Sequence, residues 1–527
     1  MPNAGNTVCC SLNRVMKTEP PASSIRQVIA ASSLGTLIEW YDFYIFGSLA
    51  VLIGKHLFPS DSGASALINT LAIFAAGFIV RPFGALVFGR LGDLVGRKYT
   101  FLLTLVLMGG STFAIGIIPG YDTIGYAAPI LVLVMRLLQG LALGGEYGGA
   151  ATYVSEHSPP HRRGFFTSWI QTTATLGLFL SLGVILITKK TMGDEAFNDW
   201  GWRIPFIVSI VLVLVSIYIR MKMSESPAFT KLKKEGKVSA NPLKESFSKR
   251  SNFKMVLLAL FGAVMGQGVV WYTGQFYAQS FIENICKIEF EQSRTILIWA
   301  ILFATPFFIV FGSLSDKIGR KWIMMGGMFL AIISYRPIYS YFMSATDVKT
   351  KTEITEKRTE NRKAVFNAAT NDSTVTTITN TAYTDGTTMK VVKKETVSLV
   401  PVDKPSKPEI KTEKTIPDST YWIFVLLVFV QILYVTMVYG PIAAFLVELF
   451  PTKIRYSSMS LPYHIGNGVF GGLVPFLGTL IVSFTMTEAN PTGDPLAGLW
   501  YPIGIATLCL IIGVIFLNNK RDENVMD

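Results

Sequence analysis

Three charged residues lie inside long apolar stretches of this sequence, where ionised side chains are costly and usually functional. Glu39 and Asp42 lie in the stretch 26–54, and Arg136 lies in the stretch 126–153. If both stretches are helices, Glu39 and Asp42 share one face, and the helical rise places Arg136 at a similar depth. An arginine favours the ionised carboxylate and dry surroundings favour the neutral one, so such a site can take up and release a proton. The alternative is a static ion pair that joins two helices.

A fourth charged residue, Glu146, lies in a glycine-rich part of the same stretch as Arg136. The glycines form two overlapping pairs of small residues of the kind that allow close contact between membrane helices. These glycines are Gly144, Gly145, Gly148 and Gly149. A carboxylate inside such a contact must be paired or protonated. Glu146 therefore joins Glu39, Asp42 and Arg136 as a candidate for proton coupling, although a structural role fits the pattern equally well.

Further polar residues in the apolar stretches are candidates for lining a substrate cavity. Arg81 precedes Pro82, and a guanidinium can hold a carboxylate through two parallel hydrogen bonds. His464 can titrate near neutrality. The alternatives are a helix-bracing role for Arg81, a simple hydrogen bond for His464 beside Tyr463, and interfacial belts for the tyrosines. The candidate substrate-binding residues are Arg81, Arg136, Gln171, Tyr272, Gln275, Tyr439 and His464.

The segments that must position these residues have the composition of a membrane protein. Half of the residues are apolar and 16% are charged, and the apolar residues form runs of about 20, the length that crosses a bilayer. We therefore predict an all-α membrane protein with twelve transmembrane helices. The predicted spans are 26–54, 64–91, 100–119, 126–153, 165–188, 203–221, 254–282, 294–315, 321–343, 420–449, 458–487 and 498–518. The segment 1–25 lacks the apolar core of a signal peptide.

The distribution of basic residues predicts the orientation in the membrane. The formal net charge is +12, but the basic residues lie at predicted helix ends and in loops, without the interleaved aromatic residues of a nucleic-acid platform, so nucleic acid is not an expected partner. Short loops with Arg97, Arg162 and Lys317 fall on the same side as the basic connector 222–253. By the positive-inside rule this side is cytoplasmic, together with the N-terminal segment 1–25 and the tail 519–527.

The longest connector, 344–419, has no span of its own and is expected on the opposite, outer side. Within it, 373–400 alternates Thr with Val, Ile and Tyr around Asp385 and Gly386. This pattern predicts a β-hairpin with a two-residue turn. The following prolines predict an extended linker back to the membrane. A partly disordered loop is the alternative.

An internal repeat determines the predicted architecture. The sequence Gly89-Arg-Leu-Gly-Asp93-Leu-Val-Gly96-Arg97-Lys recurs from Gly312 as Gly-Ser-Leu-Ser-Asp-Lys-Ile-Gly-Arg-Lys. Each copy follows the second span of a set of six, so the chain divides into two six-helix halves, 26–221 and 254–518. The glycines permit close helix approach and a tight turn, and the aspartate can meet a facing helix end. Charges that only fix the topology are the alternative.

These paired motifs resemble the major facilitator superfamily. Further sequence segments resemble its metabolite:proton symporter family. They include Glu39-Trp-Tyr-Asp42, Arg81-Pro-Phe-Gly84, Gly201-Trp-Arg203-Ile-Pro205 and Glu448-Leu-Phe-Pro-Thr-Lys-Ile-Arg455. The resemblance covers both halves except 1–25 and 344–419. It implies that the repeated turns act as a conformational latch. The implied latch residues are Gly89, Asp93, Gly96, Arg97, Gly312, Asp316, Gly319 and Arg320.

The function expected from the resemblance is secondary active uptake driven by protons through alternating access. Arg81 and Arg136 offer buried positive charge, which favours a small organic acid, such as a di- or tricarboxylate, as the substrate. A proline or betaine transporter is the alternative, which the short tail makes less favourable because it lacks the heptads of a C-terminal coiled coil. A non-transporting membrane sensor that uses 344–419 is the alternative from another class.

The remaining expectations concern partners and location. No enzyme activity is expected, because no nucleophile, metal cluster or phosphate loop has a usable spacing, and no metal or cofactor is expected. The expected partners are a small-molecule substrate, protons and the lipid bilayer. We expect a monomer in a bacterial inner membrane.

Overall fold

The computed structural model describes residues 25–519 except 60–63, 222–224, 368–371, 399–407, 489 and 491–492. The expected cytoplasmic segments 1–25 and 519–527 lie outside the described residues, apart from Ile25 and Asn519. Among the described residues, nine helical stretches are long and apolar enough to cross a membrane. Three further helices complete twelve spans in the predicted order: α1 (Ile25–Ser48), α3 (Ala64–Leu94) and α17 (Arg320–Thr346).

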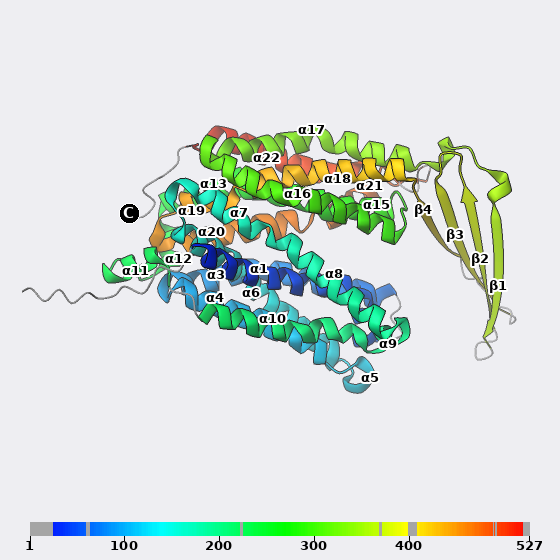
Figure 1. Ribbon diagram of the computed structural model, residues 1–527, viewed down its shortest axis with the longest axis horizontal. Helices are drawn as coiled ribbons and strands as arrows, with labels where there is room; N and C mark the ends of the chain where they lie inside the picture. The colour runs from blue at the N-terminus through cyan, green and yellow to red at the C-terminus, as the bar shows by residue number, and fades with distance from the viewer. Residues whose placement is uncertain are drawn as a thin grey trace, which may run out of the picture.

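The N-terminal half contains the first six spans (Figure 1). Besides α1 and α3, its elements are α2 (Ala50–Leu57), α4 (Arg97–Ile117), α5 (Tyr121–Ile124), α6 (Ala127–His157), α7 (Arg163–Gln171), α8 (Thr173–Met192), α9 (Asp194–Asp199) and α10 (Ile204–Met221). Helices α3 and α6 touch through their backbones, because a Cβ atom on Gly84 would overlap Leu141. The same close packing places the backbone carbonyl of Arg81 in α3 against Gly144 of α6.

The C-terminal half follows the connector helices α11 (Pro227–Lys234) and α12 (Pro242–Ser248). Its seventh span is interrupted by two π-helical turns, η4 and η5, a distortion that often marks functional sites in helices. The elements of this span are α13 (Arg250–Ala259), η4 (Leu260–Val264), α14 (Met265–Tyr272), η5 (Thr273–Tyr277) and α15 (Ala278–Asn284). The later spans are α16 (Phe290–Ile318), α17, α18 (Asp418–Tyr439) with α19 (Ile442–Leu449), α20 (Arg455–His464) with η9 (Ile465–Gly471) and α21 (Val474–Phe484), and α22 (Trp500–Phe516).

The two halves lie side by side and have different ends (Figure 1). At one end, helices α3, α7, α19 and α20 of the two halves gather together, and both copies of the repeated turn lie there. We call this the motif end. At the other end, helices α8 and α16 diverge, and a β-sheet extends from the C-terminal half. We call this the sheet end.

The sheet is an antiparallel meander in the order β1-β2-β3-β4, an addition to the predicted all-α fold. Its strands are β1 (Thr359–Asn367), β2 (Asp372–Ala382), β3 (Thr388–Ser398) and β4 (Glu409–Thr415). Strands β2 and β3 form a hairpin at the predicted place, but the predicted two-residue turn is wrong. Pairing stops at Ala382 and Thr388, which leaves a longer loop, 383–387. Asp385 accepts hydrogen bonds from Thr387 and Lys351 across this loop, so its side chain stabilises a wider turn.

Strand β4 attaches the sheet to the helical bundle. The Lys414 amide donates to the carbonyl of Lys287 over 2.7 Å, and the Lys414 carbonyl accepts from the Glu289 amide over 2.8 Å. The Lys414 ammonium also donates to the Thr346 carbonyl at the end of α17. β4 lies where the sequence predicted only an extended linker, because its backbone pairs with β3.

Candidate functional site

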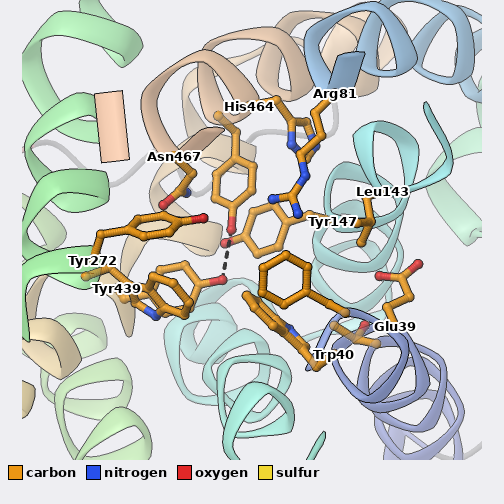
Figure 2. Close-up of a pocket in the computed structure, with 13 residues that line it drawn as sticks. Glu39, Trp40, Arg81, Leu143, Tyr147, Tyr272, Tyr439, His464 and Asn467 are labelled. Carbon is orange, nitrogen blue, oxygen red and sulfur yellow. Dashed lines mark hydrogen bonds between the residues drawn. The ribbon is translucent and has the colours of Figure 1, made fainter. Parts of the chain in front are cut away.

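A small cavity lies between the two halves, near the middle of the bundle (Figure 2). Its walls come from α1, α3 and α6 of the N-terminal half and from α14, α18, α20 and η9 of the C-terminal half. It encloses about 50 Å³, which is room for a few water molecules. The cavity must therefore expand before it can hold a metabolite.

Arg81 is the cationic residue that lines this cavity (Figure 2). Its guanidinium lies over the rings of Phe78 and Phe43, 4.2 Å and 5.4 Å from their centres. Tyr272 of the opposite half lies close to this guanidinium and lines the same cavity. Among the described residues Arg81 makes no ion pair with a carboxylate, although Glu39 lines the same cavity and lies within electrostatic reach of it.

Tyrosines and a histidine form the C-terminal wall of the cavity. The hydroxyls of Tyr439 and Tyr463 are 2.8 Å apart, and Tyr463 stacks on Tyr147 of α6 with ring centres 3.6 Å apart. His464 lies beside Tyr463, with the two ring centres 5.1 Å apart and the rings nearly perpendicular. Gln171 lies behind this wall, because it donates to the Tyr147 hydroxyl and does not line the cavity.

A charge cluster buried in the N-terminal half lies next to the cavity. Arg220 of α10 forms a salt bridge with Glu146 and also donates to the Phe101 carbonyl. Thr104 donates to the second Glu146 oxygen over 2.8 Å. Glu39 lies next to this salt bridge, within electrostatic reach of both Glu146 and Arg220. Arg220 forms its salt bridge with Glu146 and not with Glu39.

Asp42 lies in a separate group with Arg136. Arg136 donates to Gln139 over 2.8 Å, and Gln139 donates to Thr112 over 2.7 Å. Asp42 is fully buried near Arg136 and Thr112, yet neither of its oxygens accepts a well-formed hydrogen bond from any described residue. The expected trio of Glu39, Asp42 and Arg136 is therefore divided, with Glu39 paired elsewhere.

A second, larger cavity of about 260 Å³ lies between the halves on α1, α8, η5 and α16. Gln275 lines this cavity together with Gln279 and Arg294, so it does not belong to the central site. Aromatic contacts between the halves, Trp40 with Trp271 and Tyr44 with Phe276, lie between the two cavities.

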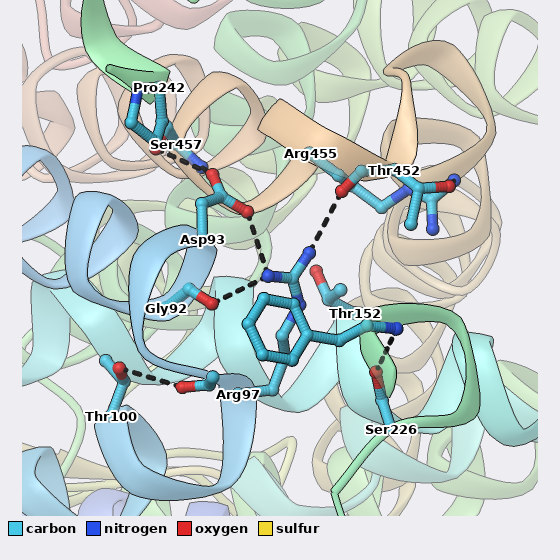
Figure 3. Close-up of polar contacts among 12 residues, drawn as sticks. Gly92, Asp93, Arg97, Thr100, Thr152, Ser226, Pro242, Thr452, Arg455 and Ser457 are labelled. Atoms are coloured by element: carbon cyan, nitrogen blue, oxygen red, sulfur yellow. Dashed lines mark hydrogen bonds and ion pairs between the residues drawn. The ribbon is translucent and has the colours of Figure 1, made fainter. Parts of the chain in front are cut away.

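The first copy of the repeated turn joins the halves at the motif end (Figure 3). Asp93 accepts hydrogen bonds from the amide and hydroxyl of Ser457, at 2.9 and 2.7 Å, and pairs with Arg97 at 3.1 Å. Arg97 donates to the Thr452 carbonyl of the other half. Gly89 permits this approach, since a Cβ atom there would lie 3.0 Å from the Cα of Ser457.

The second copy of the turn makes the equivalent contact in the opposite direction. Asp316 accepts from the amides of Gly164 and Phe165, at 2.8 and 2.7 Å, and pairs with Arg320 at 2.8 Å. The two remaining glycines, Gly96 and Gly319, have φ angles of +136° and +95°, which only glycine adopts readily. Each repeat thus carries a carboxylate to the first turn of a helix in the other half.

Glu156 adds a buried ion pair across the same interface. It binds Arg455 of the C-terminal half at 2.9 Å, lies 3.8 Å from Arg97, and accepts from Ser226 at 2.5 Å. Its counterpart Glu448 pairs instead with Arg320 of its own half. Both glutamates lie seven residues before an arginine that begins a helix, Arg163 for Glu156 and Arg455 for Glu448.

Arg220 is the main residue that sequence reasoning missed. It lies in the last turn of α10, where a basic residue looks like an ordinary helix-end charge. The available signal was Glu146, because a carboxylate within a glycine contact needs a partner. Arg294 was missed for the same reason, since it lies near the start of α16.

Comparisons with known proteins agree with this architecture. A family model described as sugar (and other) transporter matches residues 28–355. A putative metabolite transport protein of Haemophilus influenzae is 32% identical over 525 residues, or 97% of both chains. The Escherichia coli proline/betaine transporter is 36% identical over 59% of this chain and 63% of its own length, so the match spans less than two thirds of that relative. The E. coli alpha-ketoglutarate permease is 38% identical over 59% of this chain and 71% of the relative.

Solved structures show the same fold. The major facilitator superfamily proton:xylose symporter XylE is 16% identical, with a TM-score of 0.64 over 95% of this chain and 98% of that chain. At such low sequence identity, the similarity shows the fold but not the substrate or the mechanism. The family model and the Haemophilus influenzae relative show the family, and the solved structure shows the fold. The protein belongs to the sugar (and other) transporter family and is a membrane transporter with the twelve-helix major facilitator fold.

Proposed function

We propose that the protein imports a small organic acid together with protons by alternating access. The observation that carries the proposal is Arg81, a buried cation that faces the central cavity without a carboxylate partner among the described residues. A buried guanidinium without a counter-ion is costly, and a substrate carboxylate would supply one through two hydrogen bonds. The relative that is an alpha-ketoglutarate permease supports this substrate class.

The charge cluster supports proton coupling. Glu39 lies beside the salt bridge of Glu146 and Arg220 and within electrostatic reach of Arg81. The two carboxylates balance these two cations, so a substrate carboxylate that binds Arg81 would be balanced when one carboxyl group takes up a proton. Glu39 also lines the cavity that contains Arg81. Substrate and proton would therefore bind on adjoining surfaces, with Asp42 and Arg136 as a second candidate pair.

Orientation and conformation follow from the basic loops and the motif-end contacts. The motif end carries the basic connector and would be cytoplasmic, and the sheet would then lie outside the cell. The contacts of Asp93, Asp316 and Glu156 close the motif end. The chain would work as a monomer in a bacterial inner membrane, with these contacts acting as the latch.

The test is uptake into proteoliposomes under an imposed proton gradient, screened over alpha-ketoglutarate, citrate, proline and betaine. We expect accumulation of a carboxylate by the wild type, with substrate-dependent proton entry, and its loss in Arg81→Gln. Arg162→Gln is the matched control, because Arg162 is an exposed arginine at the motif end. Carboxylate uptake that survives in Arg81→Gln would contradict the assignment of Arg81.

A zwitterionic osmolyte is the second candidate, favoured by the aromatic walls. Trp40 and Trp271 approach to 5.4 Å and line the cavity with Tyr272, and such rings can hold a quaternary ammonium group. In that case betaine uptake would be lost in Trp271→Ala as well as in Arg81→Gln. Uptake of alpha-ketoglutarate without betaine would reject this candidate.

A further inference from the structure

Tyr456 is a residue of the C-terminal half whose side chain is buried inside the N-terminal half. It lies in α20, immediately before Ser457, and is 0% exposed. Its hydroxyl donates to the Gly145 carbonyl of α6. Its ring fills space that exists because Gly92 and Gly148 have no side chains: a Cβ atom on Gly92 would overlap the ring, and one on Gly148 would lie 3.1 Å from it.

The position of Tyr456 connects two groups of charges. On one side lie Asp93 and Arg97 of the motif-end interface, and on the other lie Glu39 and Glu146 of the charge cluster, all within electrostatic reach of the Tyr456 hydroxyl. Its hydrogen-bond acceptor, the Gly145 carbonyl, belongs to the residue directly before Glu146. The ring therefore fills the space between the motif end and the buried carboxyl groups.

We propose that Tyr456 is a removable plug that keeps the carboxyl groups of Glu39 and Glu146 dry from the motif end. This inference rests on the proposed proton coupling. Because α20 belongs to one half and α3 and α6 to the other, opening the motif end separates Asp93 from Ser457 and withdraws the neighbouring ring. The glycine-lined space then fills with water, and the proton of the cluster leaves by that route. While the ring is inserted, the carboxyl groups exchange protons only with the central cavity.

The first experiment measures proton leak. Proteoliposomes that contain a trapped pH-sensitive dye receive an inward proton gradient without substrate. In Tyr456→Ala we expect proton entry to rise severalfold over the wild type, since the cluster is then open to both ends. Tyr456→Phe keeps the ring and should remain near the wild type. Tyr339→Ala is the matched control, because Tyr339 is equally buried and donates to the Thr273 carbonyl, but within one half.

The second experiment does not depend on proton coupling. A water-soluble carbodiimide is added to the purified protein, and modification of Glu146 is followed by peptide mass spectrometry. We expect faster modification in Tyr456→Ala than in Tyr339→Ala. Gly92→Ala should also speed the modification of Glu146, because its Cβ atom displaces the Tyr456 ring. This variant replaces Tyr456→Ala if the latter does not fold.

The two arms separate the plug from the proposed function. A wild type that transports substrate without proton entry would contradict proton coupling. The carbodiimide experiment alone would then test whether Tyr456 shields Glu146. Unchanged modification of Glu146 in both Tyr456→Ala and Gly92→Ala would overturn the plug. So would an equal leak in Tyr456→Ala and Tyr339→Ala, because the leak would then reflect general loosening.

Discussion

Asp93 and Asp316 show how one side chain can join two halves of a molecule reversibly. Each lies at the end of a helix in one half and accepts hydrogen bonds from the first turn of a helix in the other. The first amides of a helix have no intrahelical partners and carry partial positive charge, so a carboxylate there is stabilising. Both contacts cross the interface, so they stabilise only the state in which the motif end is closed.

The aspartates therefore predict a conformational effect of their amide variants. Asp93→Asn or Asp316→Asn removes the charge and one acceptor oxygen, and should destabilise the closed motif end by about 1–3 kcal/mol. We expect slow uptake in proteoliposomes with normal membrane insertion. Glu291→Gln at the exposed start of α16 is the control. Normal turnover of both aspartate variants would show that the turns do not act as a latch.

Arg220 leads to a prediction about stability. Its salt bridge with Glu146 is fully buried, and removal of one partner of a buried pair typically costs about 3–5 kcal/mol. Arg220→Gln should therefore lower the thermal unfolding midpoint of the detergent-solubilised protein and abolish accumulation. The double variant Arg220→Gln with Glu146→Gln should regain part of the stability, because no charge is left unpaired. A double variant less stable than Arg220→Gln would contradict this account of the cluster.

At the residue scale, the sequence predicts how far along its helix each charged residue lies, but not the direction in which its side chain points. The helical rise placed Glu39 and Arg136 at one level, but of the two only Glu39 lines the central cavity. Which way each side chain points depends on how α1 is rotated against α6 and α10. Glu39 faces Glu146 and Arg220, whereas Asp42, one turn further along α1, faces Arg136. Apolar length alone contains no information on that rotation.

Among the elements, apolar length was enough to predict the twelve spans, because a bilayer requires a fixed number of apolar residues. The π turns η4 and η5 were not predictable, since they depend on packing against other helices. In the insertion, the alternation of Thr with apolar residues predicted β2 and β3, but no such pattern predicted β1 and β4. The strand β4 is rich in Lys and Glu, and it is a strand because β3 offers a free edge and Lys414 pairs with the bundle.

The sheet leads to a prediction at the scale of the element. Its described anchors, at Lys287, Glu289 and Thr346, belong to the C-terminal half alone. Replacing 351–413 with a short Gly/Ser linker, with Lys414 kept, should therefore leave proton-driven uptake intact. Membrane abundance and uptake are measured together, with the intact chain as the reference. Lost uptake at normal abundance would show that the sheet belongs to the transport mechanism.

For the whole molecule, the contacts define one stage of a cycle. The contacts of Asp93, Asp316, Glu156 and Tyr456 across the interface close the motif end, while a cavity of about 260 Å³ separates the halves near the sheet end. The central cavity, at about 50 Å³, is too small for an organic acid, whose pocket would need about 300 Å³ or more. Substrate entry must therefore move the aromatic contacts of Trp40 and Tyr44 while the motif end stays closed.

Glu156 and Glu448 provide a matched test of this scheme, because they occupy repeated positions but pair differently. Glu156 binds Arg455 across the interface, whereas Glu448 binds Arg320 within the C-terminal half. Glu156→Gln removes the carboxylate that binds the buried Arg455 guanidinium across the interface, at a cost of about 3–5 kcal/mol that disappears when the motif end opens to water. Glu448→Gln changes no ion pair between the halves, so its effect on opening should be small.

The measurement is labelling from the motif end. A cysteine replaces Ser460, which is buried against Gly148 of the other half, in a chain whose four native cysteines are substituted. A water-soluble maleimide should label this cysteine much faster in Glu156→Gln than in the parent, and at nearly the parent rate in Glu448→Gln. Equal rates in the two variants would mean that the ion pair between Glu156 and Arg455 does not hold the motif end closed. Closure would then rest on the aspartates and on the ring of Tyr456, and the amide variants of Asp93 and Asp316 should show the faster labelling instead.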